Sequence, residues 1–288
     1  MAELFAIFEP EFMRRALAAG LLLAPLTALL GCFVVLRGLS FFGEAIGHST
    51  IAGVAVGLLL GLSPQDDTGL FLATLVGFSL LCAVAIHMLE TRGALRTDTS
   101  IAIIYSSTIA MGNLLISSLA SQNSSITMVE VLFGSILFVQ MEEIASLAAL
   151  LALVALFLAK HRHQLTLMTL HPEYAEAVGV PTRRLSLLFL LLLTMSVAVG
   201  VRMMGAILIT ALLVIPAAAA RNISATLRTM LLAGCVLSAL SITGGMLLAD
   251  RLDAPAGSTI VVLAFGIFLA SLAWAAKKRS QLPVEESV

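Results

Sequence analysis

The sequence is poor in charge. Only 11% of its 288 residues are Asp, Glu, Lys or Arg, whereas a soluble domain carries roughly 25%. Hydrophobic residues make up 60% of the chain, and the mean hydropathy is +1.07. This composition excludes an ordinary water-soluble domain, and we expect an integral membrane protein.

The sequence also lacks several motifs that carry chemistry. It has no Gly-Lys dipeptide and therefore no Walker phosphate loop, and it has no His-Glu-x-x-His motif of a zinc protease. Its three cysteines, Cys32, Cys82 and Cys235, are scattered through apolar runs and match no disulfide or metal pattern. A net charge of −1 gives no bulk attraction to nucleic acid. We therefore expect no ATP hydrolysis by this chain and no nucleic-acid partner.

What the chain does have is a series of long apolar runs. A helix needs about 20 mainly apolar residues to cross a membrane. The stretch "LAALLALVALFLA" (147–159) is apolar on every face, which excludes the alternating pattern of a transmembrane barrel. The fold class that we predict is an all-α integral membrane protein, a polytopic bundle of about nine transmembrane helices. The expected spans are residues 14–36, 42–61, 68–89, 100–120, 143–159, 185–201, 204–220, 229–249 and 257–276.

Little more than Arg202 and Met203 separates the sixth span from the seventh, so a count of eight stays open. We expect an external lead-in at 1–13, a single transmembrane domain at 14–276 and a cytoplasmic tail at 277–288. The positive-inside rule sets this orientation, with the N-terminus outside and the C-terminus in the cytoplasm. It places 12 of the 16 basic residues inside: Arg37, Arg92, Arg96, Lys160, Arg162, Arg183, Arg184, Arg221, Arg228, Lys277, Lys278 and Arg279.

Two titratable residues interrupt the second run, "GEAIGHS" (43–49). Glu44 and His48 are four residues apart and therefore lie on one face of a helix. A charged group inside a bilayer costs at least about 2.5 to 3.5 kcal/mol, so it needs compensation. One interpretation is a hydrogen bond within the pair. The other is a pair of ligands for a divalent cation such as zinc or manganese, which accept imidazole and carboxylate together. Two ligands are too few for a tight structural site. Such weak binding suits an ion that must pass through the protein.

The same span contains Gly43 with Gly47, and then Gly53, Gly57 and Gly61. Small residues at this spacing allow helices to approach closely in a membrane. We therefore expect the second span to pack inside the bundle. Glu130, in the external segment before the fifth span, would add a second carboxylate if that segment folds back, and is otherwise a solvated loop residue.

The longest patterned polar segment is "HPEYAEAVGVPTRRLS" (171–186). Pro172 suits the first turn of a helix, Glu173 and Glu176 suit its positive end, and Gly179 and Pro181 would end it. We expect a short helix on the cytoplasmic side that is either a docking surface or a plain connector.

Three stretches resemble one family. "VVLRGLSFFGEAIGHSTIAGVAVG", "LHPEYAEAVGVPTRRL" and "GAILITALLVIPAAAAR" followed by "LDAPAGSTIVVL" are similar to the membrane permease subunits of bacterial ABC importers for zinc, manganese and related divalent metals. The resemblance implies a multi-pass protein of the bacterial inner (plasma) membrane, with a second permease copy or paralogue, two cytoplasmic ATP-binding subunits and an extracytoplasmic metal-binding protein. Zn²⁺ or Mn²⁺ would be the transported substrate, with no permanently bound cofactor.

The resemblance also assigns residues. Glu44 and His48 match the acid-x-x-x-His pair of the family, in which the acid is usually aspartate. Segment 171–184 matches the coupling helix, with Glu173, Ala177, Gly179 and Val180 at the ATPase interface. Glu130 precedes the "LFGSIL" stretch that is typical of the family, although many relatives lack an acid there. Two alternatives stay open: a transporter driven by an ion gradient, in which Glu44 and His48 relay protons, and an ABC permease for an iron chelate or a cobalamin-like ligand.

Overall fold

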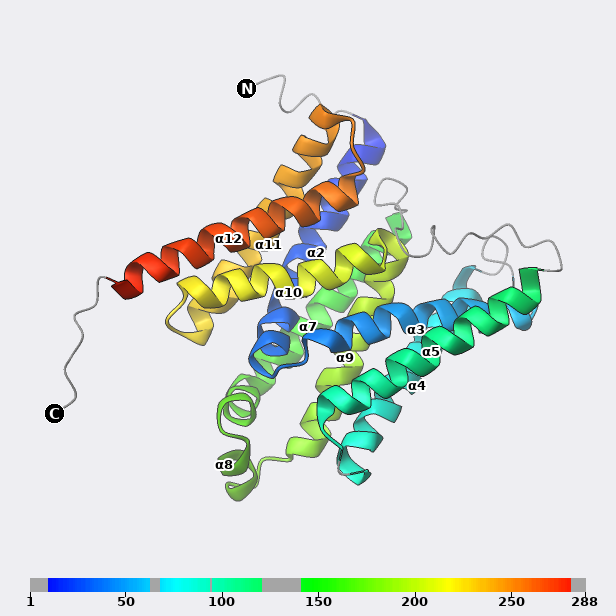
Figure 1. Cartoon of the computed structure of the whole chain (residues 1–288), viewed down its shortest axis with the longest axis horizontal. Helices are drawn as coiled ribbons and strands as arrows, with labels where there is room; N and C mark the ends of the chain where they lie inside the picture. The colour runs from blue at the N-terminus through cyan, green and yellow to red at the C-terminus, as the bar shows by residue number, and fades with distance from the viewer. Residues whose placement is uncertain (1–9, 63–67, 94, 121–140, 281–288) are drawn as a thin grey trace.

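The computed structural model describes residues 10–62, 68–93, 95–120 and 141–280 (Figure 1). Over these residues the chain forms helices and no strands, which confirms the predicted all-α fold class. The helices are α2 (Glu11–Leu36), α3 (Ser40–Leu59), α4 (Thr68–Arg92), α5 (Thr97–Ala120), α7 (Met141–Leu170), α8 (Pro172–Ala177), α9 (Thr182–Met204), α10 (Ala206–Ile223), α11 (Leu227–Leu252) and α12 (Ala256–Ser280).

Each of the nine expected spans falls on its own long helix. Eight of these helices in the described part of the chain are long and apolar enough to cross a membrane. The ninth long helix, α5, is not among the eight, and its sequence is rich in serine and threonine. The sixth and seventh expected spans do not merge, because Gly205 separates α9 from α10 with φ of +84°. Glycine adopts this left-handed conformation without the steric cost that a Cβ imposes.

One expected span was wrong in length. We expected residues 143–159, but α7 runs from Met141 to Leu170. The hydropathy pattern marks only the part of a helix that is apolar on all faces. The helix continues through its basic segment, where Thr166 donates a hydrogen bond to the backbone carbonyl of Arg162 (2.7 Å). Helix α7 therefore extends beyond its apolar stretch and leads almost directly into α8.

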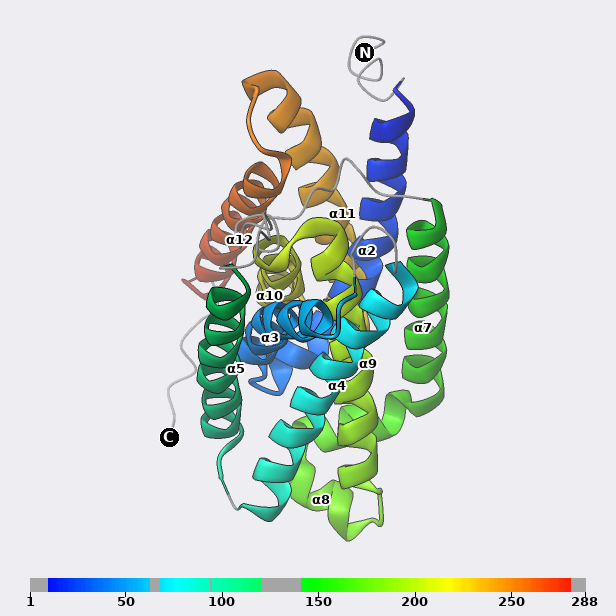
Figure 2. The ribbon, with the colours of Figure 1, turned by 90° about the vertical axis from the view of Figure 1, so that its right-hand side faces the viewer.

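Helix α3 lies inside the bundle, in contact with α4, α5, α9 and α10. Figure 2 shows α3 nearly end-on, with α4, α5 and α9 around it. Its glycines explain the close packing. A Cβ on Gly53 would lie 3.1 Å from the Cα of Leu75 on α4, and a Cβ on Gly57 would lie 2.9 Å from the ring of Phe71. The expected burial of this span is confirmed, because most of its residues are inaccessible to solvent.

Arg37 connects the end of α2 to the start of α9. It follows α2 directly, and its Nη2 donates a hydrogen bond to the Oγ of Ser186 in the first turns of α9 (2.7 Å). Its guanidinium carbon lies 5.2 Å from the ring centroid of Phe189. Burial lowers the pKa of the Arg37 guanidinium, and the charge of Glu90 on α4 opposes that shift. The α2–α3 turn, which precedes Glu44 by one helical turn, is thereby fixed to the start of α9.

Candidate functional site

Glu44 and His48 lie one turn apart on α3, as their spacing predicts. The Nε2 of His48 is 2.9 Å from the Oε1 of Glu44, within hydrogen-bonding distance. The His48 side chain is 19% exposed and the Glu44 side chain 39% exposed. Both groups are therefore partly accessible within a mostly buried helix, as a site that an ion enters and leaves requires.

The backbone around the pair is crowded by α10. A Cβ on Gly43 would lie 2.8 Å from the Cδ2 of Leu213, and a Cβ on Gly47 would lie 3.5 Å from the Cβ of Ala206. Glycine at these two positions lets α10 pack against the face of α3 that carries the pair. This packing brings Thr210 of α10 close to the part of α3 that carries Glu44 and His48.

Two neighbours of the pair were missed by sequence reasoning. The ring of Tyr105 on α5 makes an edge-to-face contact with the His48 ring, with centroids 5.3 Å apart and an interplanar angle of 81°. The side chain of Thr210 on α10 faces the same stretch of α3, because its Cγ2 would lie 3.6 Å from a Cβ on Gly47. Both residues are separated from the pair by many positions in the chain. No local sequence signal joins them to it, because only tertiary packing brings α3, α5 and α10 together.

The arrangement brings together two side chains that can bind a metal ion but do not surround it. Among the described residues, no group of three or more His, Cys, Asp or Glu side chains is placed to hold a metal ion. Glu130, the third ligand that we considered, lies outside the described residues. Carboxylate and imidazole together suit zinc or manganese, and an incomplete shell binds an ion weakly enough for release.

The segment predicted to dock a partner forms the short helix α8. Pro172 occupies the first turn, together with Glu173, and the helix ends before Gly179, which has φ of +82°. The backbone N–H of Gly179 donates to the carbonyl of Glu176 (3.0 Å), and that of Val180 donates to the carbonyl of Ala175 (3.0 Å). The predicted start and stop of this helix are therefore confirmed. Figures 1 and 2 place α8 at the end of the bundle away from the start of α2.

The side chains of this segment face outward. Glu173, Ala177 and Gly179 are exposed, and Val180 is partly buried. Tyr174 and Val178, which sequence reasoning did not select, are large apolar residues that are 60% and 58% exposed. A helix that exposes such side chains and buries only Ala175 offers a surface on which another protein can dock.

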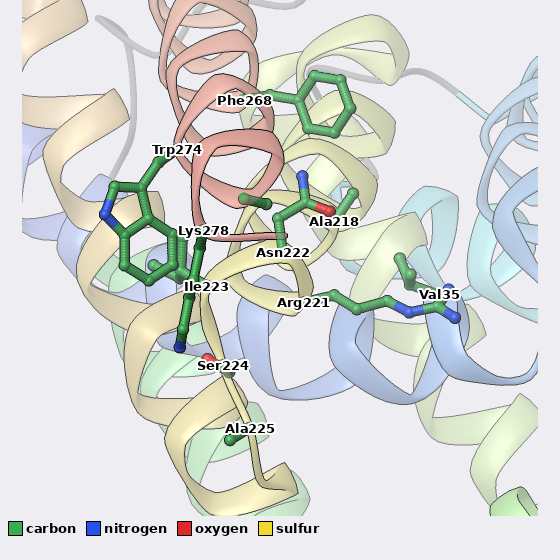
Figure 3. Close-up of a pocket in the computed structure, with 11 residues that line it drawn as sticks. Val35, Ala218, Arg221, Asn222, Ile223, Ser224, Ala225, Phe268, Trp274 and Lys278 are labelled. Carbon is green, nitrogen blue, oxygen red and sulfur yellow. The ribbon is translucent and has the colours of Figure 1, made fainter. Parts of the chain in front are cut away.

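A separate cavity of about 410 Å³ lies between the end of α10, the following turn and α12. Its lining residues include Arg221 and Lys278 but no acid. Figure 3 shows Lys278 beside Trp274, whereas Arg221 extends toward Val35. The two cations therefore do not converge, and the cavity has no ligand set for a metal cation.

The chain is similar to known transport proteins over most of its length. Residues 9–275 match the ABC 3 transport family. The chain is 32% identical over 269 residues to the manganese import system permease protein ScaB of Streptococcus gordonii, covering 93% of each chain. It is 30% identical over 262 residues to the high-affinity zinc uptake system membrane protein ZnuB of Haemophilus influenzae, covering 91% of this chain and 97% of the relative.

Two solved structures have the same fold. PsaBC from Streptococcus pneumoniae in complex with Fab matches with a TM-score of 0.81 and 30% identity, over 96% of this chain and 97% of the other. An inward-facing putative metal-chelate type ABC transporter matches with a TM-score of 0.68 over 96% of this chain and 89% of the other. At 19% identity, the second likeness concerns the fold alone. The family match spans nearly the whole chain, and this chain belongs to the ABC 3 transport family.

Proposed function

We propose that this chain is the membrane permease subunit of an ATP-driven importer that moves a divalent transition metal ion, manganese or zinc, across the bacterial inner membrane. The observation that carries the proposal is the Glu44–His48 pair on the buried helix α3, in a chain similar to manganese and zinc permeases over more than nine-tenths of its length. The metal is the transported substrate, and the chain itself is a transport component rather than an enzyme.

The pair would act as a transit site. An arriving ion replaces the Glu44–His48 hydrogen bond with bonds to the Glu44 carboxylate and the unprotonated His48 imidazole, because a metal ligand must give up its proton. Tyr105 on α5 packs against the His48 ring, and Thr210 on α10 lies beside this stretch of α3. Since two ligands bind an ion weakly, the ion leaves when the conformation changes the surroundings of α3.

The driving conformational change would come from partner subunits. The complex comprises a second permease copy or paralogue, two cytoplasmic ATP-binding subunits and an extracytoplasmic metal-binding protein. Segment 171–184, which contains α8, docks an ATP-binding subunit in the cytoplasm. This assignment places the N-terminus outside, the tail 277–288 inside and residues 14–276 in one transmembrane domain. Alternating access then opens the α3 region first to the outside and then to the cytoplasm.

Metal uptake by the complete complex in proteoliposomes tests the transit site. Glu44→Ala combined with His48→Ala is expected to lower the initial rate of zinc or manganese uptake at least about tenfold, because the variant leaves no metal ligand on this face of α3. The matched control combines Glu11→Ala with His161→Ala, which removes the same two residue types outside the pair. Uptake that survives in the first variant would rule out the transit site.

The docking assignment needs its own measurement. Ala177→Asp places a charge on the exposed face of α8, and Gly179→Ala puts a Cβ on a residue with φ of +82°. Both are expected to lower the amount of ATP-binding subunit that co-purifies with the permease, together with uptake. The control is Gly266→Ala, because no atom lies within 4 Å of the added methyl group. Normal co-purification in the α8 variants would contradict docking at α8.

A further inference from the structure

A second cavity, of about 710 Å³, lies between α2, α7 and α11. Its floor is apolar and includes Leu29 and Phe33 of α2, Leu158 of α7 and Leu231 of α11. Helices α7 and α11 each pack on α2. The cavity is the space that these two helices leave over the second half of α2.

Small residues on α7 keep this space open. Ala155 and Ala159 line the cavity, and both are exposed. They are four residues apart and therefore lie on the same face of the helix. Larger side chains at these positions would fill the volume, so the cavity depends on the two alanines.

The rim of the cavity is cationic. Arg162 and His163 of α7 lie on one wall and Arg228 of α11 on the other, and both arginines are exposed. The Nε of Arg162 donates a hydrogen bond to the Nε2 of His163 (3.2 Å), which leaves the terminal nitrogens of that guanidinium available. None of the residues that line the cavity is acidic. Guanidinium groups match the geometry of phosphate oxygens, with up to two parallel hydrogen bonds.

An apolar floor beneath a cationic rim fits an amphiphile with an anionic head. An inorganic phosphate ion would leave the apolar floor without an apolar partner. A lipid without a net charge would leave the two arginines without an anion to bind. Basic pockets between transmembrane helices on the cytoplasmic side bind anionic headgroups, and the proposed orientation, on which this inference rests, puts Arg162 and Arg228 on that side. We propose that the α2/α7/α11 cavity binds one anionic phospholipid, with its phosphate at Arg162 and Arg228 and an acyl chain along Leu158 and Leu29.

The bound lipid would fix α7 to α11. Helix α7 continues past Arg162 to Leu170 and is followed at once by α8. A lipid that bridges Arg162 and Arg228 therefore restrains the helix that leads into α8. The site concerns membrane lipid and not metal, so its test does not depend on which metal is transported.

Lipid retention by the purified complex tests the proposal. The complex is incubated in detergent with phosphatidylglycerol, phosphatidylcholine or inorganic phosphate, and bound lipid is counted by native mass spectrometry alongside the melting temperature. We expect phosphatidylglycerol to be retained and to raise the melting temperature, and the other two to do neither. Arg162→Gln combined with Arg228→Gln is expected to weaken phosphatidylglycerol retention at least about tenfold. The matched control, Arg14→Gln with Arg251→Gln, removes two exposed arginines elsewhere and should retain lipid as the wild type does.

A second variant tests the floor without changing charge. Ala159→Trp should abolish phosphatidylglycerol retention while all rim residues remain. The proposal is overturned if both variants retain the lipid normally, or if inorganic phosphate raises the melting temperature as much as phosphatidylglycerol does. It is also overturned if the arginine variant loses the second permease or the ATP-binding subunit while lipid retention is unchanged, because the face would then contact protein. If the wild-type complex took up no metal, the proposed function would be contradicted, but the result on lipid binding would still hold.

Discussion

At the residue scale, the orientation of His48 depends on two different contacts. The Glu44 carboxylate lies at hydrogen-bonding distance from one ring nitrogen, and the Tyr105 ring packs edge-to-face against the imidazole. Metal ligands usually need such supporting contacts, because a ring that rotates freely loses entropy on binding. In the proposed transit site Tyr105 would therefore be a positioning residue, and its ring makes the contact with His48.

The Tyr105 contact gives a prediction that separates ring from hydroxyl. Tyr105→Phe keeps the edge-to-face packing, so metal uptake should stay within about twofold of the wild type. Tyr105→Ala removes an aromatic contact worth about 0.5 to 1.5 kcal/mol, which corresponds to a loss of roughly twofold to thirteenfold in affinity. Uptake measured over a range of metal concentrations gives the half-saturating value for each variant. Equal loss in both variants would mean that the hydroxyl, and not the ring, is what matters.

At the element scale, glycines decide how close α3 and α10 come to their neighbours. The tightest approach is between α2 and α10, where a Cβ on Gly31 would lie 1.9 Å from the backbone oxygen of Leu213. A backbone oxygen cannot rotate away as a side chain can. The same residue, Leu213, also packs at Gly43 beside the Glu44–His48 pair. The position of α10 relative to the pair therefore depends on contacts that only glycine permits.

Glycine-to-alanine substitutions test this packing directly. Gly31→Ala must push α2 and α10 apart, which is expected to destabilise the chain by about 1 to 3 kcal/mol or more, as overpacking does. Gly77→Ala on α4 is the control, since nothing lies within 4 Å of its added methyl group and alanine favours the helix. The melting temperature in detergent should fall clearly for the first and stay equal or rise slightly for the second. Equal melting temperatures would show that the two helices separate at little cost.

At the scale of the whole molecule, the proposed transit site and the proposed docking helix lie on different elements of the bundle. Glu44 and His48 lie on α3, α8 lies at one end of the bundle, and the sequence has no phosphate-binding loop. Arg37 and Ser186 connect the two regions mechanically, because they join the α2–α3 turn to the start of α9, immediately after α8. A force applied at α8 can therefore reach α3 through contacts that the structure contains.

This organisation predicts that the chain needs its partners for uphill transport. Reconstituted alone, with a pH gradient and no ATP, it should accumulate no zinc or manganese above the level of empty liposomes. The complete complex should accumulate either metal only when ATP is supplied on the side of the ATP-binding subunits. Gradient-driven accumulation by the chain alone would instead support proton transfer by Glu44 and His48 and would overturn the proposed mechanism.

The sequence by itself determined the features that depend on local rules. Apolar runs of sufficient length must form helices in a membrane, because no water is available to pair with the backbone. Pro172 and Gly179 set the limits of α8, and four-residue spacing sets Glu44 and His48 on one face of a helix. These features need only neighbours close in the chain, so a single sequence contains them.

Tertiary structure alone decided what surrounds those features. Tyr105 on α5 packs against the pair and Thr210 on α10 lies beside it, and Arg162 and Arg228 reach a common cavity from α7 and α11. Residues this far apart in the chain leave no periodic or local pattern in the sequence. Their contacts depend on which helices pack together and at what rotation. The continuation of α7 past residue 159 was hidden for a related reason. Hydropathy reports burial in an apolar environment, whereas helix length also depends on backbone hydrogen bonds that polar residues form equally well.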